Sequence, residues 1–209
     1  LNKLILQKRI QGLAYSIPAY ASLTLAYDPF VLSFEELEEQ IWGLLGEAHQ
    51  LDRVIAKRIL KIPVCYETPF SLDKEEVLGQ LGLNWEEIIR LHTQTKFRVY
   101  MLGFLPGFTY MGKLPLGLAC KRKAKPRLRV PARSVGLAGL QTGIYPSEAP
   151  GGWQLIGKTP LEVFDPTHEK TFLLEAGDEL FFEHIKMHQY EEIRSAIEHK
   201  IFDYQSLIQ

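Results

Sequence analysis

The pattern of hydrophobic and polar residues predicts a small α/β unit at the start of the chain. Residues 1–10 have helical character, and residues 22–27 alternate as a strand. A helix is predicted from Ser33, because Ser33 and Glu36 form a capping box that precedes an apolar stripe. Since the helical character begins at the first residue, Leu1, we expect the natural N-terminus to lie further upstream.

A polar stretch at residues 47–53 is the predicted linker to the rest of the chain. Residues 58–66 then alternate as a strand, and Pro63 within it predicts an edge position or a bulge, because proline cannot donate to a sheet. We therefore expect a first domain over residues 1–57 and a second over residues 58–209.

Two short helices are predicted after this strand. Each has an acceptor residue three positions before a glutamate: Asp73 before Glu76, and Asn84 before Glu87. Such residues accept hydrogen bonds from the free backbone N–H groups at a helix start. Asp73 and Asn84 are therefore both predicted as N-caps.

From residue 96 onward the pattern changes to short strands separated by turns. Residues 96–102 alternate as a strand, and residues 103–157 are too rich in glycine and proline for long helices. Further strands are predicted at residues 161–164, 171–174 and 179–182. Many short strands with frequent turns predict a closed or partly closed β-barrel, and the helical spacing of apolar residues after Met187 predicts a final helix.

Composition and charge mainly exclude certain classes of protein and kinds of site. The 24 Lys and Arg residues nearly balance the 25 Asp and Glu residues, so no overall field attracts nucleic acid or an anionic membrane. The chain has no membrane-length apolar run and no signal-peptide pattern, which favours a cytoplasmic protein. Cys65 and Cys120 lie far apart and give no disulfide framework. His184 and His188 lack the frame of a zinc site, so no metal is predicted.

Residues 152–159 match the phosphate-loop pattern G-x-x-x-x-G-K-[ST]. This pattern binds phosphate only where a buried strand leads into it and a helix leaves it. Here a turn-rich segment precedes it, Pro160 follows directly, and the loop itself contains bulky residues such as Trp153. We therefore predict a short strand over residues 153–156, with glycine turns on either side, and no nucleotide loop.

The candidate ligand-binding residues lie in the glycine-rich middle of the chain. Phe104 and Phe108 sit among glycines, where they either form a wall for a flat ligand or cap one end of the barrel. Among the cations of residues 121–129, most are predicted to be solvated. Arg127 is the exception, because it follows Pro126 on rigid backbone and suits two-pronged binding of a carboxylate or phosphate.

Neutral polar groups follow in the same region. Gln141, Thr142 and Tyr145 either recognise an amide or lactam or satisfy the backbone of their own loop. Ser134 lacks the turn of a nucleophilic serine, and no Cys-His motif is present. The chain alone therefore supplies no complete catalytic set, and its catalytic residues stay unassigned.

Three long motifs resemble a single protein family. They are GFLPGFTYMGKLP at residues 103–115, KPRLRVPARSVGLAGLQTGIYP at 125–146 and APGGWQLIGKTPLEVFDP at 149–166. The chain is similar over nearly its whole length to the family of 5-oxoprolinase B subunits, also called allophanate hydrolase subunit 1 or the kinase-inhibitor KipI family. The resemblance implies an α+β fold, with a small N-terminal α/β domain followed by a cyclophilin-like β-barrel domain and a C-terminal helix. It also implies that the phosphate-loop match is a coincidence, because the family commonly has another basic residue at the position of Lys158.

The resemblance further implies a function. The chain would be a non-autonomous subunit of an ATP-dependent 5-oxoprolinase, which opens 5-oxo-L-proline to L-glutamate. Its partners would be the homologous, larger C subunit of 5-oxoprolinase (allophanate hydrolase subunit 2) and the A subunit, with ATP bound on this chain or on a partner. Two alternatives stay open: an inhibitor that binds a sensor histidine kinase, and a subunit of an allophanate or urea amidohydrolase.

Expected roles combine this activity with side-chain chemistry. Arg127 is expected to bind the substrate carboxylate. The lactam is expected to contact Gln141, Thr142 and Tyr145, and the apolar walls are expected to come from Phe104, Phe108 and Trp153.

The chain departs from the family pattern in three places. Arg133 stands where the family usually has glycine, and is expected to narrow the pocket or add a cation to it. ETPFSLDK, at residues 67–74, replaces a glycine-rich stretch. The family's opening strand has no counterpart, so the first domain is expected to lack its first strand.

Overall fold

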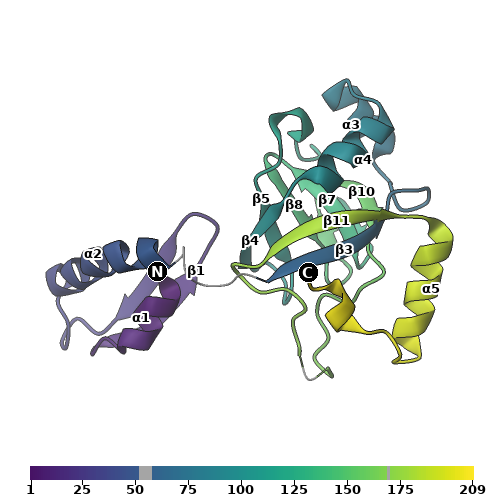
Figure 1. The fold of residues 1–209 in the computed structure, drawn as a ribbon. Coiled ribbons are helices and arrows are strands. Elements are labelled where there is room, and N and C mark those ends of the chain that lie inside the picture. The colour runs from purple at the N-terminus through teal and green to yellow at the C-terminus, as the bar shows by residue number, and fades with distance from the viewer. Residues whose placement is uncertain (52–57, 169) are drawn as a thin grey trace. The chain divides into compact units, whose positions relative to one another are not determined.

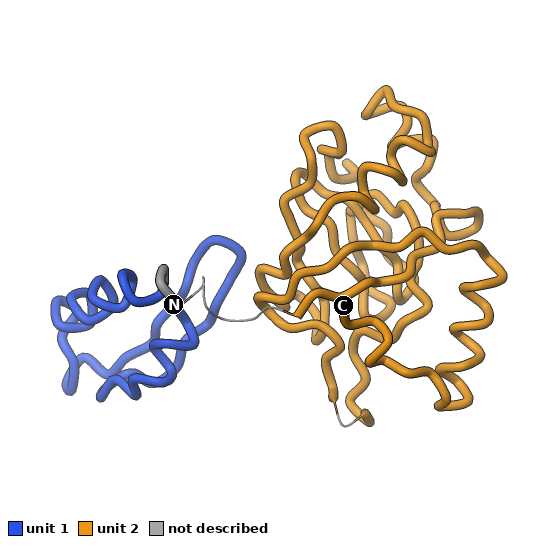
Figure 2. The backbone as a smooth tube through the Cα atoms, viewed as in Figure 1, with its two compact units in different colours: residues 1–57 blue, residues 58–209 orange. Residues whose placement is uncertain are grey.

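The computed structural model describes residues 1–51, 58–168 and 170–209, and the chain divides into two compact units, residues 1–57 and 58–209 (Figure 2). In the first unit, an antiparallel pair of strands is combined with two helices (Figure 1). These elements are α1 (Asn2–Lys8), β1 (Leu13–Pro18), β2 (Leu23–Tyr27) and α2 (Phe34–Leu51).

The first unit confirms the early helix, the strand at residues 22–27 and the helix that begins at Ser33. The Ser33 hydroxyl accepts from the Glu36 N–H at 3.2 Å, and Glu36 accepts in turn from the Ser33 N–H at 2.9 Å, as a capping box requires. The linker prediction is wrong over residues 47–51, because α2 continues to Leu51; residues 52 and 53 lie outside the described residues.

The second unit contains the predicted β-barrel, which is closed. Its hydrogen-bonded order is β10-β3-β11-β4-β5-β8-β7. The strands are β3 (Ile59–Cys65), β4 (Phe97–Leu102), β5 (Thr109–Gly112), β7 (Ser134–Ala138), β8 (Gln141–Ile144), β10 (Gln154–Lys158) and β11 (Glu179–Ile185). A separate two-stranded ribbon is formed by β6 (Arg127–Val130) and β9 (Ala149–Gly151).

In the described residues of the second unit, α-helices accompany the barrel (Figure 1). They are α3 (Lys74–Leu81), α4 (Trp85–Gln94) and the C-terminal α5 (Met187–Glu198), with short 3-10 turns at Leu116–Leu118 and Tyr204–Leu207. The predicted α+β class, with a barrel and a final helix, is confirmed. No helix in the described part of the chain is long and apolar enough to cross a membrane.

The position of β3 differs from the prediction. Pro63 lies in a regular parallel pairing with Glu183 of β11, so β3 is not bulged there, and the closed barrel gives β3 a neighbouring strand on both sides. On its other side, the pairing of β3 with β10 joins only Cys65 and Lys158 in the described residues. The missing N–H of Pro63 is therefore tolerated, because the neighbouring ladder on that side meets β3 only at its end.

Two predicted strands, at residues 161–164 and 171–174, are wrong. These segments meet only in the isolated bridge between Phe164 and Phe172, whose rings lie 5.4 Å apart. Pro160 and Pro166 lack the N–H groups that a longer ladder needs. The third prediction is confirmed, and β11 continues three residues further, to Ile185.

Candidate functional site

Two glycines make room for a cluster of aromatic rings against the barrel wall. Gly136 of β7 lies opposite Gly143 of β8 in the antiparallel register. A Cβ on Gly143 would lie 2.6 Å from the Thr109 carbonyl oxygen and within 3.2 Å of the Trp153 and Phe108 rings. Only glycine allows this close approach, which explains the glycine spacing of the motif at residues 125–146.

We call Phe108, Tyr110, Tyr145 and Trp153 the aromatic cluster. The Phe108 ring centroid lies 4.9 Å from that of Tyr145 and 5.4 Å from that of Trp153, both edge-on. Phe108, Tyr145 and Trp153 are buried, and burial raises the pKa of the Tyr145 phenol to about 12. The structure thus brings these three predicted residues together as packed core.

Phe104 is the member of the predicted wall that faces solvent. Its side chain is 62% exposed, and its ring lies edge-on to Phe108 at 5.8 Å. Its φ of 72° is in the left-handed region, which is rare for a residue other than glycine.

Thr142 lies inside the barrel and belongs to a buried chain of hydrogen bonds. The Tyr66 hydroxyl is 2.7 Å from His92 Nδ1, His92 Nε2 is 3.0 Å from Thr142 Oγ1, and Thr142 donates to the Gly136 carbonyl at 3.1 Å. Since the Thr142 hydroxyl uses its proton on Gly136, it accepts from His92, which fixes the neutral Nε2–H tautomer. Burial lowers the pKa of His92 to about 3, in keeping with a neutral ring.

The other two polar candidates, Gln141 and Tyr145, do not lie next to each other. Gln141 begins β8 and Tyr145 directly follows it, so about 13 Å of strand separates them at roughly 3.3 Å per residue. Because Thr142 is fully buried and uses its hydroxyl internally, the three residues do not line one pocket in this structure.

Arg127 is held by a carboxylate of the same chain. Its two terminal nitrogens donate to the two Asp73 oxygens at 2.7 and 2.6 Å, the two-pronged geometry expected of an arginine on rigid backbone. The predicted recognition of a carboxylate therefore occurs, but with Asp73 in the place of a ligand.

Asp73 is the centre of this ion-pair network and not a helix cap. It precedes α3 but makes no side-chain cap hydrogen bond, whereas Asn84 accepts from the Glu87 N–H as predicted. Its oxygens also accept from Lys123 at 2.9 Å and from the Leu155 N–H at 2.7 Å. Burial alone would raise the pKa of Asp73, but the hydrogen bonds from Arg127, the Leu155 N–H and Lys123 together lower it.

Lys123 is a correction to the predicted solvated run of cations. Besides Asp73, its ammonium binds Glu76, whose other oxygen accepts from the Gln154 side chain at 2.7 Å. The exposed Lys121 and Lys125 fit the prediction.

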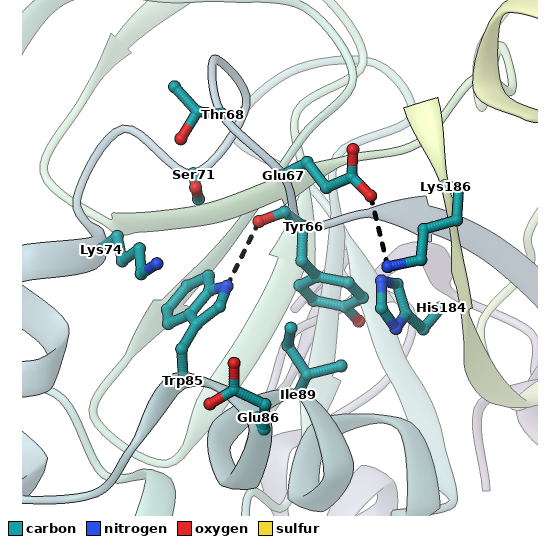
Figure 3. Close-up of a pocket in the computed structure, with 10 residues that line it drawn as sticks. All are labelled: Tyr66, Glu67, Thr68, Ser71, Lys74, Trp85, Glu86, Ile89, His184 and Lys186. Atoms are coloured by element: carbon teal, nitrogen blue, oxygen red, sulfur yellow. Dashed lines mark hydrogen bonds and ion pairs between the residues drawn. The ribbon is translucent and has the colours of Figure 1, made fainter. Parts of the chain in front are cut away.

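Two adjoining pockets open beside this network. The first, of about 340 Å³, is drawn in Figure 3 and is lined by Tyr66, Glu67, Thr68, Ser71, Lys74, Trp85, Glu86, Ile89, His184 and Lys186. The second, of about 470 Å³, reaches Asp73, Lys123 and Arg127. The two share Thr68, Ser71 and Lys74, so these residues stand at the junction of the two pockets.

Ser71 and Lys74 are the groups at this junction that have hydrogen-bonding capacity to spare. Ser71 Oγ is buried and has no hydrogen-bond partner among the described residues. The Lys74 ammonium lies 5.5 Å from the centre of the Trp85 ring, and no carboxylate of the described residues is assigned to it. A buried hydroxyl without a hydrogen-bond partner calls for an explanation, and a polar ligand in the adjoining pockets would provide one.

The other side of the first pocket is charge-balanced. Glu67 and Lys186 form an ion pair at 3.5 Å, and the His184 ring stands edge-on to Tyr66 (Figure 3). Partial burial and the nearby Lys186 lower the pKa of His184. Glu67 and Lys186 therefore compensate each other, and the other charged side chains that line this pocket are Lys74 and Glu86.

The segment that matches the phosphate-loop pattern is mostly strand. It contains β10, Gln154–Lys158, and no helix begins between residues 159 and 168. The prediction of a short strand is confirmed, with its bounds shifted by one or two residues. Without a helix N-terminus to aim N–H groups at phosphates, residues 152–159 do not form a phosphate loop.

Metal-binding groups are not gathered in the described residues. No set of three His, Cys, Asp or Glu side chains there could hold an ion. Cys65 and Cys120 are both buried as free thiols.

Comparison with known proteins matches residues 1–174 to the family described as "Carboxyltransferase domain, subdomain C and D". The B subunit of 5-oxoprolinase from Bacillus subtilis (strain 168) is 43% identical over 189 residues, covering 86% of this chain and 78% of that protein. The protein of the same name from Escherichia coli O157:H7 is 39% identical, covering 84% of both chains.

Solved structures share the fold. That of TTHA0988 matches with a TM-score of 0.73 and 39% identity over 88% of this chain, which spans about a third (35%) of that longer chain. The conserved uncharacterized protein PH0987 from Pyrococcus horikoshii matches with a TM-score of 0.61 and 38% identity, covering 90% of this chain and 86% of that one. The Kluyveromyces lactis urea amidolyase, at 17% identity and a TM-score of 0.73, covers 99% of this chain and 14% of that one, and shows the fold alone.

Proposed function

Because this chain belongs to the family of 5-oxoprolinase B subunits, we propose that it is a subunit of an ATP-dependent 5-oxoprolinase that opens 5-oxo-L-proline to L-glutamate. The identity of 43% and 39% to two bacterial proteins of that name supports the reaction class. The junction of the two pockets supports a binding role within it, because Ser71 and Lys74 there have free hydrogen-bonding capacity.

The protein works only with its partners. In the described residues, Ser71 Oγ has no base within hydrogen-bond distance to activate it, so the pocket binds but does not supply a nucleophile. Residues 152–159 offer no phosphate loop, which favours an ATP site on a partner. We propose that the partners are the homologous, larger C subunit and the A subunit. ATP supplies the free energy for opening an unactivated lactam.

Within the complex we assign the substrate to the junction of the two pockets. The Lys74 ammonium binds the carboxylate of 5-oxo-L-proline, Ser71 Oγ hydrogen-bonds the lactam, and Trp85 forms an apolar wall. Arg127 is less suited to the carboxylate, because a ligand would have to displace Asp73 from both of its nitrogens. We propose that Arg127 instead holds the loop before α3, which carries Ser71.

We propose that Lys74 and Ser71 hold the substrate in a way that is particular to this chain. Both residues lie in the segment 67–74, where the sequence departs from the family pattern. They are therefore proposed to set how this protein holds its substrate, while the chemistry is shared with its relatives. The likeness to urea amidolyase shows only the fold, so we propose no second function from it.

Replacing Lys74 with alanine is expected to lower kcat/KM for 5-oxo-L-proline in the reconstituted complex by about ten- to a hundredfold. A charge-assisted contact of this kind contributes on the order of 1.5–3 kcal/mol. Ser71→Ala is expected to cost less, because its contact with the lactam is neutral. The measurement is steady-state turnover of the complex at saturating ATP.

The matched control is Lys125→Ala, which removes a cation from an exposed position outside both pockets. Its kcat/KM is expected to stay near that of the unmodified complex. Equal turnover for Lys74→Ala and Lys125→Ala, with both complexes intact by size-exclusion chromatography, would place the substrate carboxylate elsewhere.

A further inference from the structure

Three cations meet where the start of β7, the end of β10 and helix α5 come together: Arg133, Lys158 and Arg194. The Thr159 N–H donates to the Arg133 carbonyl at 3.0 Å, and Lys158 is the register partner of Ser134, so Arg133 and Lys158 belong to neighbouring strand ends. Arg194 reaches the same place from α5, where it donates to the Pro160 carbonyl at 3.0 Å.

The three cationic side chains outnumber the carboxylates that lie close to them. Arg133 and Arg194 both bind the same oxygen of Glu162, at 2.5 and 2.7 Å. Arg194 also reaches Glu198 at 3.3 Å, but the Glu198 side chain is 64% exposed, so its charge is largely screened by water. No carboxylate of the described residues forms an ion pair with Lys158, whose ammonium lies 5.5 Å from the centre of the Phe70 ring.

The site also contains a hydrogen-bond donor that is not used. Arg133 Nε is buried and has no partner in the described part of the chain. The Arg133 backbone has a φ of 68°, in the left-handed region that favours glycine. A strained arginine with a buried free donor calls for an explanation beyond packing, because glycine would fit this backbone without strain.

Electrostatics are consistent with an excess of positive charge. Burial, followed by the nearby guanidinium groups of Arg133 and Arg194, lowers the pKa of Lys158, and Glu162 only partly opposes this. An anion that binds among the three cations would relieve their mutual repulsion.

We propose that Arg133, Lys158 and Arg194 form an anion site that binds a phosphate group. The three donors come from three separate elements, which suits a tetrahedral anion better than a planar one, and their combined charge favours a dianion. The arginine side chains are 20% and 17% exposed, so solutes can reach the site. This proposal does not rest on the proposed function, because it involves no residue of the substrate pocket.

Inorganic phosphate is the probe, and Arg133→Gly is the main variant. Glycine suits the backbone at φ 68°, so this variant is expected to fold. For the unmodified protein we expect a melting temperature that rises saturably with phosphate, compared with sodium chloride at equal ionic strength. We expect Arg133→Gly to weaken phosphate binding by about ten- to a hundredfold in calorimetric titration.

Arg129→Ala is the matched control, because Arg129 is an exposed arginine (82%) paired loosely with Glu148 at 3.6 Å. It is expected to keep the phosphate response, and Lys158→Gln is expected to lose most of it. The proposal is overturned if the unmodified protein shows no saturable response to millimolar phosphate. It is equally overturned if Arg133→Gly, folded by circular dichroism, binds phosphate as tightly as Arg129→Ala.

Discussion

Acidification from pH 6.5 to about 3 is expected to destabilise the second unit through His92 by an amount on the order of a few kcal/mol. The pKa of His92 is lower in the folded protein than in the unfolded chain. Between these two pKa values, His92 is protonated in the unfolded chain and neutral in the folded protein. Stability therefore rises with pH between these two values and is independent of His92 above them.

The physical origin is the buried chain of hydrogen bonds inside the barrel. His92 is fully buried, stacks on Phe182 at 4.4 Å, and meets an acceptor at Nε2 and a donor at Nδ1. A second proton on Nδ1 would oppose the Tyr66 hydroxyl and place an uncompensated charge in the core. Asp73 lowers the free energy of unfolding further only below about pH 4. Its pKa in the folded protein lies below the usual 3.8, so the stability that its carboxylate contributes is complete above that pH and is lost below it.

Urea unfolding at a series of pH values, followed by tryptophan fluorescence, measures this effect. His92→Gln removes the titrating group and is expected to flatten the slope between pH 6.5 and 4, whatever its absolute stability. If that variant does not fold, the ¹⁵N shifts of the His92 ring in the unmodified protein decide the matter. A ring that takes up a proton near pH 6 in the folded protein contradicts this interpretation.

Replacing Asp73 with asparagine is expected to lower the free energy of unfolding of the second unit by about 3–5 kcal/mol. The Asp73 side chain is 2% exposed and accepts four hydrogen bonds, from Arg127 twice, Lys123 and the Leu155 N–H. Asparagine has nearly the same shape but no charge and only one acceptor oxygen. Arg127 and Lys123 would therefore remain partly buried without their counter-ion.

The control for this variant is Glu75→Gln, because Glu75 is the exposed acid two residues further on, in the first turn of α3. Its effect is expected to stay within about 0.5 kcal/mol. Chemical denaturation of both variants at pH 7 makes the comparison. A loss below about 1 kcal/mol for Asp73→Asn would mean that the network is loosely held in solution.

Asp73 and Asn84 illustrate what local sequence can and cannot predict. Both precede a helix and stand three residues before a glutamate, but only Asn84 caps its helix. The carboxylate of Asp73 is instead bound by Arg127, which lies 54 residues further along the chain. The helices and five of the strands, β2, β3, β4, β10 and β11, follow from local periodicity, whereas β1 and the glycine-rich β5, β7 and β8 do not. The partner of a charged side chain depends on which distant segments the fold brings together.

The same limit applies to the candidate site. Phe108 and Trp153 were expected as walls of a binding site and Tyr145 as a lactam contact, with packing at one end of the barrel as the alternative for Phe108; in the structure the three rings are buried against one another. Thr142 pairs with His92 across 50 positions of sequence, which no spacing rule indicates. Ser71, to which we assign a binding role, was not among the predicted residues, because its burial without a hydrogen-bond partner is visible only in the folded chain.

Reconstitution tests the central claim, that this chain is a non-autonomous subunit of an ATP-dependent 5-oxoprolinase, most directly. The purified chain, its two proposed partners without it, and the mixture of all three would be assayed for glutamate formed from 5-oxo-L-proline and for ADP formed from ATP. We predict turnover in the mixture, with glutamate and ADP in a fixed ratio, and none from the chain alone. Robust ATP-dependent turnover by the chain alone, or turnover by the partners that its addition does not increase, would contradict the account.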